Sequence, residues 1–121
     1  VNGRPDRFSA FATLPTRDPQ AAAKELERCV NDFGFKGAML HGLTAGKFHD
    51  EEEFWPIFER AAALDVPIYI HPGMPHPQVI DLYYGTYKDK YPPIMQAGWG
   101  FTVETATAGV RLVLGSLRKI P

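Results

Sequence analysis

The stretch PIYIHPGMPHP, residues 67–77, carries the chain from a run of apolar residues to a histidine and then into a proline-rich segment. Residues 67–70 are typical of a buried β-strand. His71 follows directly, and Pro72 then turns the chain out of the sheet, because its ring restricts the backbone of the preceding residue and it has no amide for a strand ladder. The sequence therefore predicts that the His71 side chain faces a cavity at the end of a strand.

Two earlier strands are expected over residues 8–14 (FSAFATL) and 35–42 (FKGAMLHG). The first is followed by an amphipathic helix that begins after the N-cap residue Asp18 and ends at the C-cap residue Gly34. A second helix is expected to begin near the pair Asp50 and Glu53, in the manner of a capping box, and to run to residue 64.

A long loop is expected over residues 72–93, which hold five of the eleven prolines and four of the five tyrosines. Loops of this length in compact domains are usually functional or disordered, and the aromatic residues favour an ordered lid. A last helix is expected from about residue 98 to residue 117. Its apolar side would hold Trp99, Val103, Ala106, Val110, Val113 and Leu117.

The resulting order of elements, strand and helix in alternation three times, predicts an α/β fold with parallel strands. The expected strand ends at Thr13, His41 and His71 lie about 30 residues apart, the length of one βα unit. Right-handed crossovers would place the three strands side by side. No glycine-rich phosphate loop follows any strand, which argues against a nucleotide-binding Rossmann fold.

Composition narrows the function classes. The 121 residues, 45% of them hydrophobic, suffice for one domain with a core. The net charge of −1 and the lack of a basic stripe argue against nucleic-acid binding. No apolar run is long enough to cross a membrane. The single cysteine, Cys29, is expected to be buried in a helix, and one cysteine fits a reducing compartment, so we expect the cytoplasm.

Four histidines are the first candidates for chemistry. His41 and His71 are both expected at the carboxyl ends of strands, where parallel α/β folds carry their sites, and about 5 Å apart if the strands are adjacent. Imidazole is a common metal ligand, but a lone histidine at a strand end is more often only a hydrogen-bonding residue, so spacing leaves both roles open. His49 and His76 lie in polar loops, where we expect solvation, although His76 could touch a substrate.

Trp99 and Glu104 lie at the start of the expected last helix, near the same carboxyl ends of the strands. The simpler expectation is packing for Trp99 and an exposed carboxylate at the start of a helix for Glu104, with substrate contact as the alternative for each.

Four stretches resemble one family. They are FATLPTRDPQAAAKELERCV, GFKGAMLHG, FWPIFERAAALDVPIYIHPG and GWGFTVETATAGVRLVLGS. Together they are similar, in order and over nearly the whole chain, to the amidohydrolase-related decarboxylases. That family includes γ-resorcylate, 5-carboxyvanillate and aminocarboxymuconate semialdehyde decarboxylases. The most specific part is ALDVPIYIHP, which ends at His71 and Pro72.

The resemblance implies a metal-dependent (β/α)8 barrel in which His71, the histidine of the HP motif, binds zinc or manganese. Residues 1–121 would be a single incomplete segment of about three βα units, lacking the N-terminal and C-terminal barrel strands. The family's other metal ligands and its catalytic histidine have no counterpart here, so no catalytic residue is assigned. His41, His76, Trp99 and Glu104 are candidates for substrate contact.

The implied activity of the complete protein is non-oxidative decarboxylation of an aromatic or unsaturated carboxylic acid, with residues 1–121 inactive alone. The implied partners are a small carboxylate substrate and further copies of the chain in a homo-oligomer, with no nucleic acid or membrane. Two alternatives stay open. One is a metal-dependent hydrolase of the same superfamily, such as a lactonase, and the other is a small non-catalytic α/β domain that binds a ligand.

Overall fold

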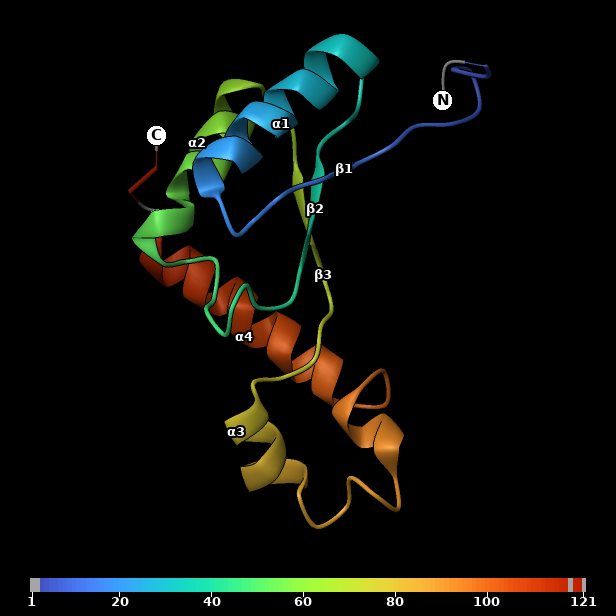
Figure 1. The fold of residues 1–121 in the computed structure, drawn as a ribbon, viewed down its shortest axis with the longest axis vertical. Helices are drawn as coiled ribbons and strands as arrows, with labels where there is room; N and C mark the ends of the chain where they lie inside the picture. Colours follow the sequence, from blue (N-terminus) through green and yellow to red (C-terminus); the bar gives the residue numbers. More distant parts are fainter. Residues whose placement is uncertain (1–2, 118, 121) are drawn as a thin grey trace.

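The computed structural model describes residues 3–117 and 119–120, and it has three parallel strands with helices packed on one side (Figure 1). The strands are β1 (Ala12–Thr13), β2 (Ala38–His41) and β3 (Ile68–His71), in the sheet order β1-β2-β3. The longer helices are α1 (Pro19–Phe33), α2 (Trp55–Ala63) and α4 (Gly100–Gly115). The short helical turns are η1 (Glu52–Phe54), α3 (Pro77–Val79), η2 (Ile80–Tyr84) and η3 (Pro92–Met95). The predicted α/β fold, three consecutive βα units of a barrel, is confirmed.

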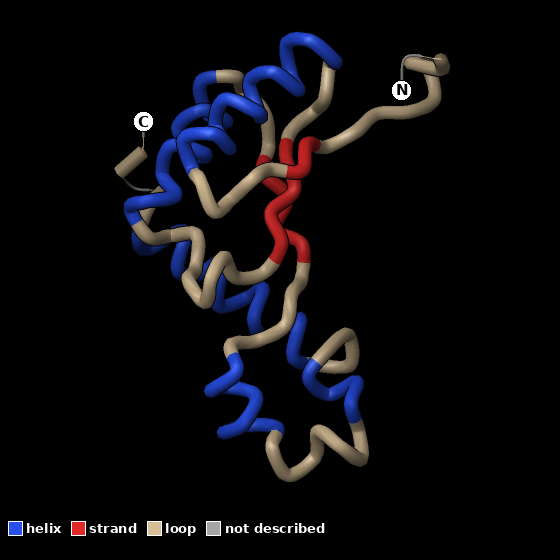
Figure 2. Tube along the Cα trace, in the orientation of Figure 1, coloured by secondary structure: helices blue, strands red, loops and turns tan. Residues whose placement is uncertain are grey.

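The strands pair in a register that aligns their carboxyl ends. Ala38 of β2 pairs with Ala12 of β1 and with Ile68 of β3, and His41 pairs with His71 at the last step. Because side chains alternate along a strand, Ala38 and Leu40 point towards the helices and His41 points to the opposite face. That opposite face carries no helix of the described chain (Figure 2).

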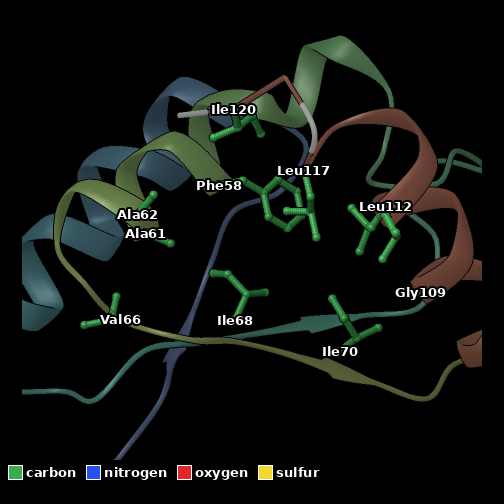
Figure 3. Close-up of a pocket in the computed structure, with 11 residues that line it drawn as sticks. Phe58, Ala61, Ala62, Val66, Ile68, Ile70, Gly109, Leu112, Leu117 and Ile120 are labelled. Carbon is green, nitrogen blue, oxygen red and sulfur yellow. The ribbon is translucent and has the colours of Figure 1, made fainter.

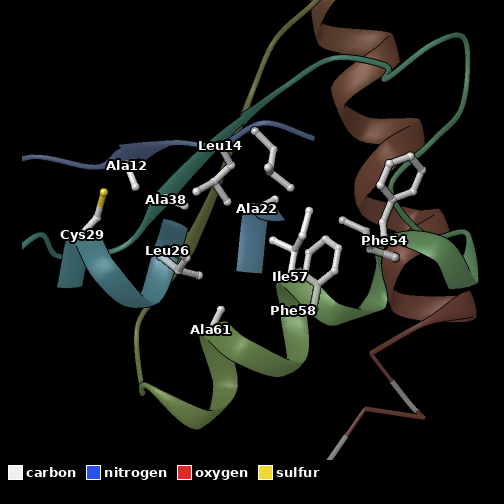
Figure 4. Packing of buried hydrophobic residues seen from close by; sticks show 12 residues of the cluster. Ala12, Leu14, Ala22, Leu26, Cys29, Ala38, Phe54, Ile57, Phe58 and Ala61 are labelled. Carbon is white, nitrogen blue, oxygen red and sulfur yellow. The ribbon is translucent and has the colours of Figure 1, made fainter. Parts of the chain in front are cut away.

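The core lies between the sheet and the pair α1 and α2 (Figure 4). Leu26, Leu40 and Ile57, one from each layer, have no exposed surface. Burying a side chain of this size stabilises the fold by about 1.5–3 kcal/mol. Cys29 is buried in the same cluster, as predicted.

The first strand is shorter than predicted. Residues 8–14 were expected to be extended, but only Ala12 and Thr13 pair with β2. Residues 8–11 have no assigned secondary structure, although the carbonyl of Ala10 accepts from the amide of Lys36 at 2.9 Å, and a turn precedes them in which the amides of Arg7 and Phe8 donate to the carbonyl of Arg4. The aromatic composition predicted a strand, but a strand at the edge of the described sheet has a single neighbour to hold it extended.

The predicted capping box is wrong. No side chain caps η1, and the two acidic residues bond elsewhere. Asp50 pairs with Arg111 of α4 at 2.8 Å, and Glu53 pairs with Lys47 at 2.6 Å. The side chains of Arg111 and Lys47 bind these carboxylates in place of the free amides at the start of the helix. The sequence pattern alone could not indicate these ion pairs.

Helix α4 buries a different side from the one predicted. Trp99, which precedes the helix, is 56% exposed, and Val110 is 60% exposed. The buried residues are Gly100, Glu104 and Leu112, which recur at multiples of four positions. Glu104 and Leu112 line cavities together with Ile70 of β3. Small residues let the helix approach the strand on that side, and the larger apolar side chains are left without a partner among the described residues.

A cavity of about 560 Å³ lies between α2, β3 and α4 (Figure 3). Ile68 and Ile70 point into it from the strand, and Phe58 and Leu112 from the helices. Its lining residues are all apolar or glycine and none is titratable. The cavity lies on the helix side of the sheet, whereas His71 faces the other side, so it is a packing feature and not a site for chemistry.

Residues 72–99 extend away from the sheet, beyond the carboxyl end of β3 (Figure 1). The segment is folded into α3, η2 and η3, where the sequence predicted an ordered loop. Tyr84 is buried, whereas Leu82 is 79% exposed and Tyr83 is 62% exposed. None of the helices in the described part of the chain has the length and apolar character that a membrane crossing requires.

Candidate functional site

His41 and His71 lie side by side at the carboxyl ends of β2 and β3. They are paired in the strand register, and their ring centroids are 4.6 Å apart with an angle of 39° between the planes. The side chain of His41 is exposed and that of His71 is partly buried. The predicted juxtaposition of the two imidazoles is therefore present.

The proline after His71 determines which ring nitrogen of that histidine is available. His71 Nδ1 lies 2.8 Å from the carbonyl oxygen of Pro72. A carbonyl oxygen can only accept a hydrogen bond, so Nδ1 is a donor, and Nε2 is the nitrogen that has a lone pair in the neutral ring. A histidine whose Nδ1–H donates to a backbone carbonyl is the usual arrangement for a metal ligand that binds through Nε2.

Two glycines let the loops leave the sheet close to the histidines. A Cβ atom at Gly73 would lie 2.6 Å from the Cα of Gly42, closer than real Cβ atoms approach. Gly42 also has a positive φ of 44°, and its amide donates to the carbonyl of His71 at 3.2 Å. Both positions need glycine for the chain to pass beside His71.

Glu104 is buried in a cavity that His71 also lines, which corrects the expectation of an exposed carboxylate. It is 7% exposed, and its Oε1 has no hydrogen-bond partner among the described residues. It lines a cavity of about 10 Å³ together with His71, Gly42 and Gly73. Burial raises the pKa of the Glu104 carboxyl group, and the charge of His76 opposes that rise.

His76 and Trp99 lie farther from the paired histidines. His76 is partly buried and is the N-cap of α3, where its Nδ1 accepts from the amide of Gln78 at 3.2 Å. Trp99 lines a shallow apolar depression on the outer side of α4 with Val103 and Val110. Neither residue is among those that line the small cavity beside His71. The structure therefore brings together His41 and His71 and places Glu104 in a cavity that His71 lines, and it leaves substrate contact by His76 and Trp99 as predictions.

His49 is buried, so the prediction of a solvated side chain is wrong. It is 4% exposed, and its ring packs edge-on against Phe54 with centroids 5.1 Å apart. Thr44 Oγ1 donates to Thr16 Oγ1 at 2.8 Å, and His49 Nε2 lies 2.9 Å from Thr44 Oγ1. Because the single hydroxyl proton of Thr44 is used, His49 Nε2 is the donor in the second bond. Burial lowers the pKa of His49, and the charge of Asp50 opposes this.

Sequence reasoning missed a polar pocket beside His41. Its volume is about 190 Å³, and its lining includes Arg17 and three threonines, which come from the end of β1 and from the loops that follow β1 and β2. The one sequence signal for it was an arginine placed directly before the N-cap residue Asp18, at the end of a strand. Loops at that end of a parallel sheet are where binding residues concentrate.

The described residues can supply only part of a metal site. No group of three or more His, Cys, Asp or Glu side chains in residues 3–117 and 119–120 could surround an ion. A catalytic zinc ion typically has three protein ligands. His71 fits the role of one ligand, with its Nε2 lone pair available, and the remaining ligands would have to come from elsewhere.

Comparison with curated proteins gives relatives that include several decarboxylases and a hydratase. The γ-resorcylate decarboxylase of Rhizobium radiobacter is 41% identical over 120 residues, which cover 94% of this chain and 35% of that protein. The chain therefore spans about a third of the length of this relative.

Solved structures agree. The 2,6-dihydroxybenzoate decarboxylase from Rhizobium superposes with a TM-score of 0.82 at 40% identity, covering 96% of this chain and 36% of that one. The dihydroxybenzoic acid decarboxylase from Polaromonas sp. JS666, with bound manganese and the inhibitor 2-nitroresorcinol, superposes with a TM-score of 0.81 at 39% identity, covering 93% and 34%. The family model described as amidohydrolase matches residues 1–117, and the chain belongs to the amidohydrolase family.

Proposed function

We propose that the complete protein is a metal-dependent, non-oxidative decarboxylase of an aromatic carboxylic acid. The observation that carries the proposal is the state of His71, whose Nδ1–H donates to Pro72 while Nε2 stays available beside His41. The similarity to decarboxylases of dihydroxybenzoic acids over more than nine-tenths of the chain supports the same reaction.

His71 would be one protein ligand of a divalent ion, either manganese, as in the Polaromonas relative, or zinc. When bound, such an ion supplies a Lewis acid for the substrate carboxylate and a neighbouring oxygen. His71 is suited to this role because its ring is held in one orientation by Pro72.

The other residues of the site would bind and enclose the substrate. His41, exposed on the same face, could donate a hydrogen bond to a carboxylate or phenolic oxygen. Glu104 would border the substrate from the side of α4, with His76 and Trp99 as outer contacts. Residues 72–99 would reduce the access of water to the site, which strengthens polar interactions inside it. No proton donor is assigned.

We propose the cytoplasm as the location, since the single buried Cys29 fits a reducing compartment. We also propose that the complete protein is a homo-oligomer that binds neither nucleic acid nor membranes. The near-neutral charge supports the absence of nucleic-acid binding.

The test is to assay the purified complete protein, loaded with manganese or with zinc, on 2,6-dihydroxybenzoate and on a simple lactone. We expect release of CO2 from the benzoate and no hydrolysis of the lactone. Activity on the lactone alone would favour a hydrolase of the same family. Activity on neither compound, together with an absence of bound metal, would favour a non-catalytic domain.

A further inference from the structure

The pocket beside His41 is lined by residue types that bind anions. Its lining residues include Arg17 and His41 and three threonines, Thr13, Thr16 and Thr44, together with the apolar residues Leu14, Met39, Leu43 and Ala45. No Asp or Glu is among the described residues that line it. Guanidinium and hydroxyl donors that converge on one space are suited to a carboxylate, which accepts several hydrogen bonds.

Arg17 has no hydrogen bond or ion pair with any residue in the described part of the chain, although an acidic group is near. Glu53 lines the adjoining pocket with Arg17, but it pairs with Lys47 at 2.6 Å. The Arg17 backbone is held in a tight turn, where the amide of Asp18 donates to the carbonyl of Pro15 at 2.9 Å. The Arg17 side chain therefore starts from a fixed backbone and has its donors unused.

The walls of the pocket are connected by hydrogen bonds. The chain from His49 through Thr44 to Thr16 joins the loop after β2 to the loop after β1. Because Thr16 accepts from Thr44, its own proton remains available for a ligand. Burial of His49 at one end fixes the chain of bonds, so the pocket is organised before a ligand arrives.

The position of the pocket relates it to the metal-ligand candidate. His41 lines the pocket on one side and lies against the ring of His71 on the other, with centroids 4.6 Å apart. The tips of β1 and β3 are two strand spacings apart, or about 10 Å. A benzene ring with two acidic substituents can bridge such a span when a long arginine side chain reaches from one end.

We infer that Arg17 and His41 form a subsite for a second carboxylate of the substrate, so that the preferred substrate is an aromatic dicarboxylic acid. The inference rests on the proposed function for the first carboxylate, which would be held at His71. Arg17 is a specificity residue, because a planar guanidinium can hold a carboxylate through two parallel bonds while the reacting carboxylate lies elsewhere.

The test measures binding and not turnover. The complete metal-loaded protein is titrated with benzene-1,3-dicarboxylate and with benzoate by isothermal calorimetry, for the wild type, Arg17→Gln and Arg17→Lys. Arg7→Gln is the matched control, since Arg7 is an exposed arginine outside the pocket. We expect Arg17→Gln to raise the dissociation constant of the dicarboxylate by about 10- to 100-fold and to change that of benzoate by less than about threefold. Arg17→Lys should fall between, since an ammonium keeps the charge and loses the two-bond geometry.

Two outcomes overturn the inference. In the first, the wild type binds the dicarboxylate no more tightly than benzoate. In the second, Arg17→Gln lowers the affinity for both ligands by the same factor. The failure of the proposed function is distinguishable, because a protein with this binding contrast but no decarboxylation of any aromatic acid would contradict that proposal alone.

Discussion

At the scale of single residues, the Glu104 carboxyl group is buried in a small cavity that His71 also lines, with Oε1 unbonded among the described residues. An unpaired buried polar group costs about 1–3 kcal/mol. Native proteins contain few such groups, and those that remain often have a role. The position of Glu104 in the cavity beside His71 is consistent with retention for function at the expense of stability.

We predict that Glu104→Gln stabilises the protein at pH 8 by about 1 kcal/mol and has little effect at pH 4. Burial raises the pKa of Glu104, so the native state keeps the proton as pH rises above the unfolded value near 4.5. The unfolded state then binds fewer protons than the native state, and stability falls with rising pH. Glutamine removes that titration.

Urea denaturation at the two pH values measures this difference, with Glu59→Gln as the control, because Glu59 is an exposed carboxylate on α2. A gain of the same size at both pH values would contradict the interpretation, since it would point to packing rather than to charge.

His49 gives a pH dependence of the opposite sign. Burial lowers its pKa below the usual value of 6.5, so the unfolded state binds the additional proton first as pH falls. The contribution of His49 to stability is complete above about pH 6.5 and is lost as pH falls through that value towards the lower native pKa. We predict that His49→Gln is less stable at pH 7.5 by about 1 kcal/mol, because the bond to Thr44 is altered, but loses less stability between pH 7.5 and 5.5.

Denaturation midpoints at pH 7.5, 6.5 and 5.5 test the prediction. His41→Gln is the control, because His41 is an exposed histidine. An unchanged loss of stability between pH 7.5 and 5.5 in the His49 variant would show that other groups cause it.

At the scale of elements, the ends of α1 were predictable because they depend on local chemistry. Asp18 Oδ1 accepts from the amide of Ala21 at 3.0 Å, and Gly34 has the left-handed conformation at the other end, with φ 66°. The buried side of α4 was not predictable, because it depends on which elements pack against the helix. The large apolar residues of α4 formed the stronger pattern, yet Glu104 is on the buried side.

The N-cap residue Asp18 is predicted to stabilise α1 through its hydrogen bond, and an asparagine variant serves as the control. Asp18→Ala removes the acceptor for the Ala21 amide and should lower the free energy of unfolding by about 1 kcal/mol. Asp18→Asn keeps an oxygen acceptor and should retain most of that stability. Equal losses in both variants, measured by urea denaturation, would indicate that the charge of Asp18 and not the hydrogen bond matters.

At the scale of the whole molecule, the described chain leaves much apolar surface uncovered. Val110, Val113, Leu114 and Leu117 are each at least 50% exposed on or directly after α4. Among the described strands, β3 has a neighbour on one side only. Surfaces and strand edges of this kind favour association. We predict that the isolated chain of 121 residues sediments as oligomers, and that Leu114→Lys shifts it towards the monomer. A sharp monomer peak for the unmodified chain would contradict this.

The sequence predicted the order of elements and the meeting of His41 with His71, because strand periodicity and parallel connections determine both. It did not predict the burial of His49 or Glu104 or the pocket at Arg17. Those features depend on contacts between loops that are distant in sequence, and a polar residue in a polar segment gives no signal of its own burial.

The central claim is that His71 binds a divalent ion through Nε2. The most direct measurement is the metal content of the complete protein, by elemental analysis after dialysis, for the wild type, His71→Ala and the surface control Lys24→Ala. We expect about one ion per active site in the wild type and the control, and a loss of most of it in His71→Ala, since the remaining ligands alone would hold a metal weakly. Unchanged metal content in His71→Ala would contradict it.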